Sequence, residues 1–324
     1  NEQEQLEQEY LTQTPNIQWF PGHMAKTRRK IQEDIKLVDV VAELLDARVP
    51  QSSSNPVLRD IIQRKPKVVL LNKSDMADPA QTSKWVSYYA SQGEKAIPLE
   101  SKTGKGLGAF YPTVREVLKP QIEAWEKKGM VGRPIRVMVV GIPNVGKSTF
   151  INSFAGTTRA KAANKPGVTR GKQWISVDNF DLMDMPGVLW KKFDSLETAS
   201  NLAFIGSIRD DILDIEELAC GLLSSVRGIY PEQLLARYKL DESALELPPY
   251  DLLQAIGAKR GMLISGGEVD TERAAKMLVG EFRASKWGRI SLERPPHRDT
   301  AEEVDDYAED DFPEDDPDFT DDED

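Results

Sequence analysis

Residues 141–148 have the sequence GIPNVGKS, in which the residue types and their spacing are those of a phosphate-binding loop. The segment fits the pattern G-x-x-x-x-G-K-[ST] and lies between an apolar run, residues 135–140, and a segment of helical character. In such a loop the backbone N–H groups surround the phosphates, and the N-terminus of the following helix adds its dipole. We therefore predict a nucleotide site with phosphate contacts from Asn144, Val145, Gly146, Lys147, Ser148 and Thr149.

A second motif, DMPG at residues 184–187, follows two more strand candidates and supplies groups that bound phosphates would need. We expect the Asp184 carboxylate and the Ser148 hydroxyl to hold Mg²⁺, and the Gly187 N–H to meet the γ-phosphate. Thr169, in the loop NKPGVTRG, is the candidate for a second hydroxyl ligand of Mg²⁺, and a plain polar loop is the alternative. On this interpretation Lys147 and Thr169 act in catalysis, because both contact the γ-phosphate or its metal ion.

A motif typical of guanine recognition, NKSD at residues 72–75, directly follows the apolar run 68–71. Guanine presents an N1–H and a 2-amino group on one edge, and a single carboxylate can accept both, whereas adenine lacks the amino donor. We expect Asp75 to select guanine in this way, Lys73 to lie against the ring, and Asn72 to tie this loop to the phosphate loop. The next strand candidate ends at ESKTG, which predicts a second base-contacting loop with contacts from Ser101 and Lys102.

The guanine motif precedes the phosphate loop here, whereas an ordinary GTP-binding chain has the opposite order. Residues 188–298 contain no further N-K-x-D, so the early motif is the only candidate. An ATPase or a kinase is disfavoured, because the Asp75 carboxylate finds no pair of donors on adenine. The reversed order also joins Asp184–Gly187 directly to the C-terminal part of the chain, so a rearrangement at the γ-phosphate can move that part.

The alternation of apolar and helical segments predicts the fold class. Strands are expected at 38–45, 68–71, 96–99, 135–140, 174–177 and 180–183, with helices from about Met24, at 56–64, 79–92 and 107–127, and from Lys147. This alternation favours an α/β fold, a P-loop GTPase with a mostly parallel sheet covered by helices. Helical spacing after residue 195 predicts a small all-α domain. The expected division is 1–14 disordered and acidic, 15–190 GTPase domain, 195–298 helical domain and 299–324 disordered acidic tail.

Composition excludes some classes of protein and of binding site. The chain has 324 residues and a formal charge of −11, but residues 299–324 hold sixteen Asp and Glu and no Lys or Arg, so residues 1–298 stand at +5. A mildly basic body points weakly toward nucleic acid. One cysteine excludes an intrachain disulfide, and two histidines with it exclude a usual Cys/His zinc site. The apolar runs are too short to cross a bilayer and the acidic N-terminus is unlike a signal peptide, so a cytoplasmic location is expected.

Six motifs together identify a resemblance: WFPGHMAK, DARVP, NKSD, GIPNVGKST, PGVT and DMPG. The set is similar to that of the circularly permuted GTPases, and among them to the bacterial factors that assemble the large ribosomal subunit. It covers about residues 16–298, including IGAKRG in the helical part, and the acidic tail lies outside it.

The resemblance implies two roles that the residues alone leave open. His23, in the WFPGH segment, matches the histidine that assists hydrolysis in the family, and a purely structural histidine is the alternative. Asn144 matches a K⁺ ligand that supplies charge at the phosphates, although asparagine also simply tolerates a tight turn. Val188 stands where Ras-like enzymes place a water-orienting glutamine, so turnover without a partner should be slow.

Two basic clusters indicate where RNA would bind. Residues 252–298 contain nine Lys and Arg against five Asp and Glu, and Lys26, Arg28, Arg29 and Lys30 form the other cluster. We expect them to contact rRNA phosphates, with Trp287 as a stacking group. The alternative is a solvated helix face.

Together these observations predict a GTP-hydrolysing factor that binds the large ribosomal subunit precursor and its rRNA and promotes a late maturation step. GTP and GDP are the expected ligands, Mg²⁺ and K⁺ the expected cofactors, with no membrane partner. The oligomeric state stays open, with a monomer expected. A GTPase acting on another RNA or in signalling, and an RNA-binding scaffold that uses GTP without hydrolysing it, are the alternatives.

Overall fold

The computed structural model describes residues 21–157, 174–187, 189 and 193–296, with backbone alone for residues 21–25, 27 and 157. Within these residues lies a sheet of six strands in the order β3-β2-β1-β4-β6-β5. Neighbouring strands run parallel except β5, which is antiparallel to β6. The strands are β1 (Val40–Asp46), β2 (Lys67–Asn72), β3 (Lys95–Leu99), β4 (Ile135–Gly141), β5 (Trp174–Val177) and β6 (Phe180–Asp184).

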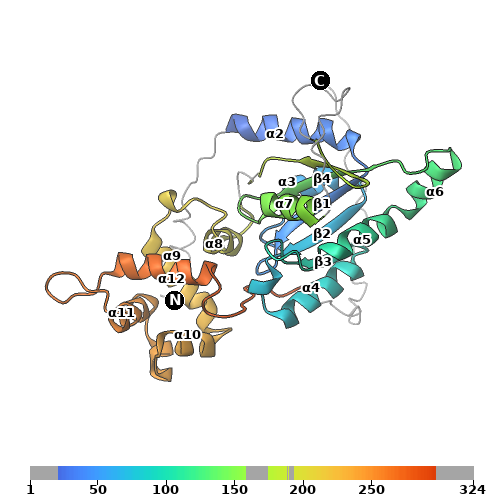
Figure 1. The fold of residues 1–324 in the computed structure, drawn as a ribbon. Helices are drawn as coiled ribbons and strands as arrows, with labels where there is room; N and C mark the ends of the chain where they lie inside the picture. The colour runs from blue at the N-terminus through green and yellow to red at the C-terminus, as the bar shows by residue number, and fades with distance from the viewer. Residues whose placement is uncertain (1–20, 158–173, 188, 190–192, 297–324) are drawn as a thin grey trace, which may run out of the picture.

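Helices cover both faces of the sheet, because both faces of its central strands are apolar (Figure 1). On one face the side chains of Val40, Ala42 and Leu44 pack with α5 (Phe110–Val117) and α7 (Lys147–Thr157). The opposite face packs against α2 (Pro21–Asp34), α3 (Pro56–Ile62) and α4 (Pro79–Ser91). The predicted α/β architecture with a mostly parallel sheet is confirmed, and each strand lies within two residues of its predicted bounds.

Two helix predictions were wrong at proline residues. The basic helix begins at Pro21 rather than near Met24, because proline is compatible with the first helical turn, where its missing N–H has no helical partner. The segment 107–127 is not one helix: α5 ends at Val117, and α6 (Lys119–Lys127) starts after Leu118. Pro120 has no N–H to donate to the carbonyl of Glu116, so the helix is interrupted there.

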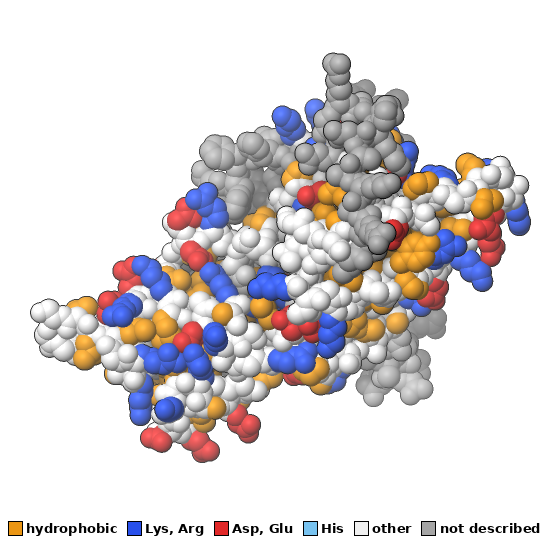
Figure 2. Space-filling model, viewed as in Figure 1, with side chains coloured by type: hydrophobic (Ala, Val, Ile, Leu, Met, Phe, Trp, Pro, Cys, Tyr) orange, Lys and Arg blue, Asp and Glu red, His pale blue; other side chains and the backbone are white. Residues whose placement is uncertain are grey.

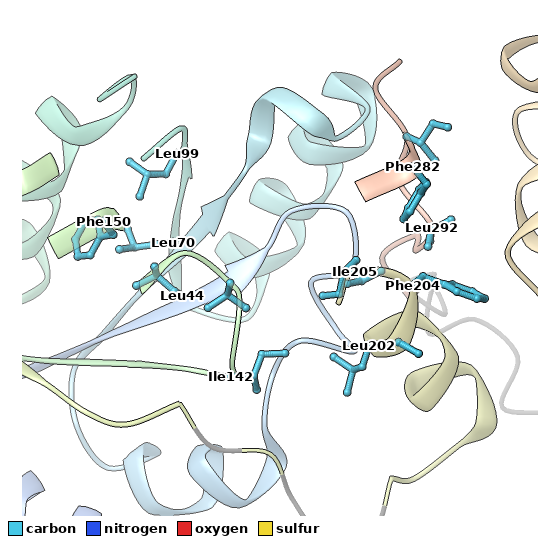
Figure 3. Packing of buried hydrophobic residues seen from close by; sticks show 14 of the residues in the cluster. Leu44, Leu70, Leu99, Ile142, Phe150, Leu202, Phe204, Ile205, Phe282 and Leu292 are labelled. Atoms are coloured by element: carbon cyan, nitrogen blue, oxygen red, sulfur yellow. The ribbon is translucent and has the colours of Figure 1, made fainter. Parts of the chain in front are cut away.

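The C-terminal helices pack around a central helix, α9 (Ile215–Arg227). Its partners are α8 (Leu196–Phe204), α10 (Pro231–Tyr238), α11 (Pro249–Lys259) and α12 (Thr271–Arg283). One continuous apolar core joins this group to the sheet: Figure 3 shows Leu44 and Leu70 of the strands, and Phe204 and Phe282 of the helices, in the same cluster. The division at residues 190–195 into two domains therefore stays a prediction. No helix of the described residues is both long and apolar enough to cross a membrane.

After α12 the chain returns to the sheet through residues 288–294, which we call the return segment. The Leu292 N–H donates to the Arg48 carbonyl at 2.9 Å, and the indole N–H of Trp85 donates to the Glu293 carbonyl at 3.4 Å. The Glu293 carboxylate is buried and accepts from the Gln51 N–H at 2.7 Å and the Ser52 N–H at 2.9 Å. The C-terminal end of the helical part is thus anchored to loops of the sheet.

Candidate nucleotide-binding site

A cavity of about 720 Å³ opens where strands β2, β3 and β4 end. These strands are parallel, so their carboxyl ends meet at one edge of the sheet and the loops that follow them converge there. Eleven of the predicted site residues line the cavity: Asn72, Lys73, Asp75, Ser101, Lys102, Asn144, Gly146, Lys147, Ser148, Thr149 and Gly187. Base-reading and phosphate-binding candidates, far apart in the sequence, therefore share one cavity.

The Asn72 side chain connects three of the converging loops. It is 1% exposed, and its Nδ2 donates to the Val145 carbonyl of the phosphate loop at 2.8 Å. Its Oδ1 accepts from the Ser101 hydroxyl at 2.7 Å and from the Ser101 N–H at 3.2 Å. The Val145 side chain is buried, and it is the backbone carbonyl of this residue that accepts from Asn72. Asn72 thus fixes the distance between the two base loops and the phosphate loop.

The phosphate loop can accept this contact because residue 146 has no side chain. Gly146 has a φ of +93°, and a Cβ there would lie 2.4 Å from Asn72 Nδ2. Gly187 approaches the same loop, since its Cβ would lie 3.2 Å from the Pro143 nitrogen. Helix α7 begins at Lys147, so its unpaired N–H groups face the cavity and favour an anion. The loop therefore has the backbone geometry of a phosphate cradle.

Lys73 makes a second connection, besides that of Asn72, between the phosphate loop and residues 72–75, which we call the guanine loop. The residue is in the left-handed region at a φ of +57°, and its Nζ donates to the Asn144 carbonyl at 2.6 Å. Burial lowers the pKa of the Lys73 ammonium, while the Asp46 carboxylate, 3.9 Å away, acts in the opposite direction. Asp75 follows in the turn Ser74–Met76, with an exposed side chain at the cavity. The partly buried Lys73 side chain and the exposed Asp75 carboxylate are therefore suited to a flat base that carries polar groups on its edge.

The residues at the phosphate end fit a magnesium ion. The Ser148 hydroxyl and the Asp184 carboxylate are hard oxygen donors of the kind Mg²⁺ prefers, and both are exposed to solvent. Lys147 Nζ donates to Asp184 Oδ1, so the candidate phosphate-binding cation and the candidate metal-binding anion lie together. Mg²⁺, when bound, neutralises charge on the phosphate oxygens. The candidate ligand Thr169 lies outside the described residues. So does the side chain of His23, the candidate catalytic residue, whose backbone is in α2.

Arg283 lines the cavity, although the sequence predicted only that it contacts rRNA as one of the basic residues in 252–298. Its guanidinium donates to the Ala203 and Phe204 carbonyls, at 2.7 and 3.0 Å, and pairs with Asp210 at 2.7 Å. It reaches the site from the end of α12, 136 positions after Lys147, so no local motif signals it. Met76, Ile142 and Pro143 are the other lining residues that were not predicted.

The prediction that Trp287 stacks on RNA bases was wrong. Its side chain is 3% exposed, packs against Phe282 and Tyr238, and donates its indole N–H to the Tyr238 hydroxyl at 2.7 Å. Aromatic residues of an amphipathic helical part fill its core more readily than they stay on its surface. Trp287 therefore stabilises the helical part and is not available to a base.

Several known proteins are similar to this chain in sequence. A family described as "50S ribosome-binding GTPase" matches residues 136–238. The ribosome biogenesis GTPase A of Priestia megaterium is 45% identical over 281 residues, which cover 86% of this chain and 97% of that protein. The protein of the same name from Thermotoga maritima is 34% identical over 283 residues, covering 86% and 95%. This chain belongs to the ribosome biogenesis GTPase A family.

Solved structures agree with this assignment. The GDP-bound structure of TM YlqF aligns with a TM-score of 0.57 at 30% identity, over 82% of this chain and 99% of that one. The GNP-bound YlqF from T. maritima aligns with a TM-score of 0.55 at 30% identity, over 83% and 98%. As a family member the chain is a GTPase with circularly permuted motifs. Permutation leaves the site intact because β1 still lies between β2 and β4, with β3 on the other side of β2, whichever strand is synthesised first.

Replacing Asp75 by asparagine tests how the base is read. We predict that Asp75→Asn weakens GDP binding by about 100-fold, since two hydrogen bonds to a charged acceptor are lost. The same change should improve binding of xanthosine diphosphate, whose 2-oxo group can accept from the new amide. Isothermal titration with both nucleotides measures this exchange. Unchanged GDP affinity would contradict the assignment of Asp75.

Proposed function

We propose that this GTPase binds the large ribosomal subunit precursor and its rRNA and promotes a late maturation step in the cytoplasm. The observation that carries the proposal is the shared cavity: base-reading candidates after β2 and β3 and phosphate-binding candidates after β4 face the same space. The named relatives support it, because the chain covers 97% of the P. megaterium ribosome biogenesis GTPase A. Within the site, the predicted roles of the lining residues are part of the proposal.

Direct contacts between the phosphate loop and the helical part support a nucleotide-controlled binder. The Asn144 amide donates to the Gly206 carbonyl at 2.5 Å, and the Ser207 hydroxyl donates to the Pro143 carbonyl at 2.7 Å. Arg283, at the end of α12, donates to the carbonyls of residues 203 and 204 at the end of α8, and so holds the segment that leads to Gly206 and Ser207. A change in the phosphate loop on hydrolysis thus has a short mechanical route to the surface proposed to contact RNA.

The basic clusters differ in how free they are to bind phosphate. In the helical part, Lys259, Arg273 and Lys286 are exposed, whereas Arg260 pairs with Glu281 and Lys276 pairs with Glu272. In α2, the exposed basic residues are Lys26, Arg28, Arg29 and Lys30. Figure 2 shows Lys and Arg side chains over the helical part and along α2, interspersed with Asp and Glu. We propose the unpaired cations of both clusters as the contacts to rRNA phosphates.

Hydrolysis is proposed to be completed by the partner. Val188 follows Gly187 and offers no hydrogen bond to water, so the site lacks a glutamine at that position. We propose that His23 supplies this function when the large subunit is bound, that Lys147 contacts the β- and γ-phosphates, and that Thr169 joins the metal site.

GTP turnover with and without purified large subunits is the direct test of this proposal. We predict slow turnover alone and roughly tenfold or greater stimulation by large subunits, assayed as phosphate release in potassium buffer. Small subunits are the matched control and should not stimulate. His23→Ala should bind large subunits normally and lose most of the stimulation. Turnover that is fast alone, or equal with both subunits, would contradict the proposal.

Asn144 provides a test of the proposed potassium site. No donor among the described residues reaches its amide oxygen, which leaves that oxygen free for an ion. We predict faster turnover in KCl than in NaCl at equal ionic strength. The variant Asn144→Gly keeps the φ of +64° accessible and removes the amide, so it should abolish the difference between the salts. An unchanged potassium preference in this variant would exclude Asn144 as the ligand.

A further inference from the structure

The loop that carries Asp75 is held from the far end of the chain. Arg289, in the return segment, donates from its Nη2 to the Ser74 carbonyl at 2.7 Å and from its Nε to the Ala77 carbonyl at 2.8 Å. These carbonyls lie before and after Asp75 along the chain. One guanidinium therefore connects the two sides of the loop that carries the proposed base-reading carboxylate.

Neighbouring residues extend the same contact. The Ile290 N–H donates to the Met76 carbonyl at 3.0 Å, and the Asp78 N–H donates to the Ser291 hydroxyl at 3.0 Å. The Tyr230 hydroxyl, from the helical part, donates to Asp78 Oδ2 at 2.9 Å. The carbonyls of residues 74, 76 and 77 thus all accept from the return segment, while the Asp75 carboxylate remains exposed at the cavity.

This loop needs external support for a physical reason. Its 3₁₀ turn, Ser74–Met76, has three residues and follows Lys73 in the left-handed region. The turn's own hydrogen bonds go to the carbonyls of Lys73 and Ser74, so the carbonyls of residues 76 and 77 depend on other donors. A cation at the C-terminal end of a turn is favourable, and Arg289 supplies one with two directed donors. Bidentate recognition of a base edge requires the carboxylate to be held within roughly 0.5 Å.

We propose that Arg289 is a positioning residue for guanine recognition: it fixes the 74–77 backbone so that the Asp75 carboxylate meets the N1–H and 2-amino group together. The inference rests on the proposed role of Asp75. It makes base selectivity depend on a residue that follows the helical part and lies 214 positions after Asp75. Arg289 does not contact the base; it acts through the loop.

Nucleotide affinities of Arg289→Ala test this role. We expect the dissociation constant for GDP to rise about tenfold, the scale of losing hydrogen bonds to a charged donor. The preference for GDP over inosine diphosphate, which lacks the 2-amino group, should shrink, and kcat at saturating GTP should stay within about twofold, because the phosphate end is untouched. Arg289→Lys keeps the charge and one donor, and should give intermediate GDP affinity.

Arg227→Ala is the matched control. Arg227 also donates to backbone carbonyls, those of Leu245 and Leu247 at 3.3 and 2.6 Å, which belong to the helical part and not to the guanine loop. It should lose comparable thermal stability and keep both GDP affinity and base preference. If Arg289→Ala matches this control in affinity, or lowers kcat without changing affinity, the inference is overturned. Arg289→Lys supplies the same comparison if the alanine variant does not fold.

Asp75→Asn separates the two levels of the proposal. If that variant does not change base preference, the proposed guanine site itself is wrong. If it does and Arg289→Ala does not, the site stands and only the role of Arg289 is rejected.

Discussion

The hydrogen bonds of the Asn72 side chain are the constraint on which the site depends. One buried amide donates to the Val145 carbonyl and accepts from Ser101, so three loops from three strand ends have fixed separations. Breaking it would leave a buried carbonyl and a buried hydroxyl without partners, which costs on the order of 1–3 kcal/mol for each. The close approach also explains Gly146, because any side chain there would overlap Asn72.

The spatial order of the strands explains how a chain with permuted motifs builds the same site as a chain with the usual motif order. Parallel strands place their C-terminal loops at one edge by adjacency in space, and β1 lies between β2 and β4 whatever the order of synthesis. What permutation changes is the connection: β6 ends at Asp184, and the chain then enters the helical part at α8. That part contacts the phosphate loop through Gly206, and the return segment that follows it contacts the guanine loop through Arg289. Both ends of the nucleotide site are therefore connected to the proposed RNA-binding surface.

The sequence predicted contiguous features well and tertiary contacts poorly. The phosphate loop was predictable because its chemistry resides in eight consecutive residues, and Asn72 and Asp75 because they belong to one short motif that ends a strand. Arg283 and Arg289 were missed as parts of the site because their partners are distant in sequence, and a surface arginine is usually solvated. Trp287 was misassigned because composition does not tell whether an aromatic side chain is buried in the core or exposed. The expected helix bounds near residues 21 and 120 were wrong because a helix start accepts proline and a helix interior does not.

The central claim is that the base loop and the phosphate loop are held at a separation that matches one guanine nucleotide. The affinities of Asn72→Ala for GDP and for inorganic pyrophosphate test it most directly, because GDP needs both loops and pyrophosphate needs only one. The account predicts that GDP binding weakens by at least roughly tenfold while pyrophosphate binding changes by less than about threefold. Full GDP affinity in this variant, or an equal loss for both ligands, would contradict it.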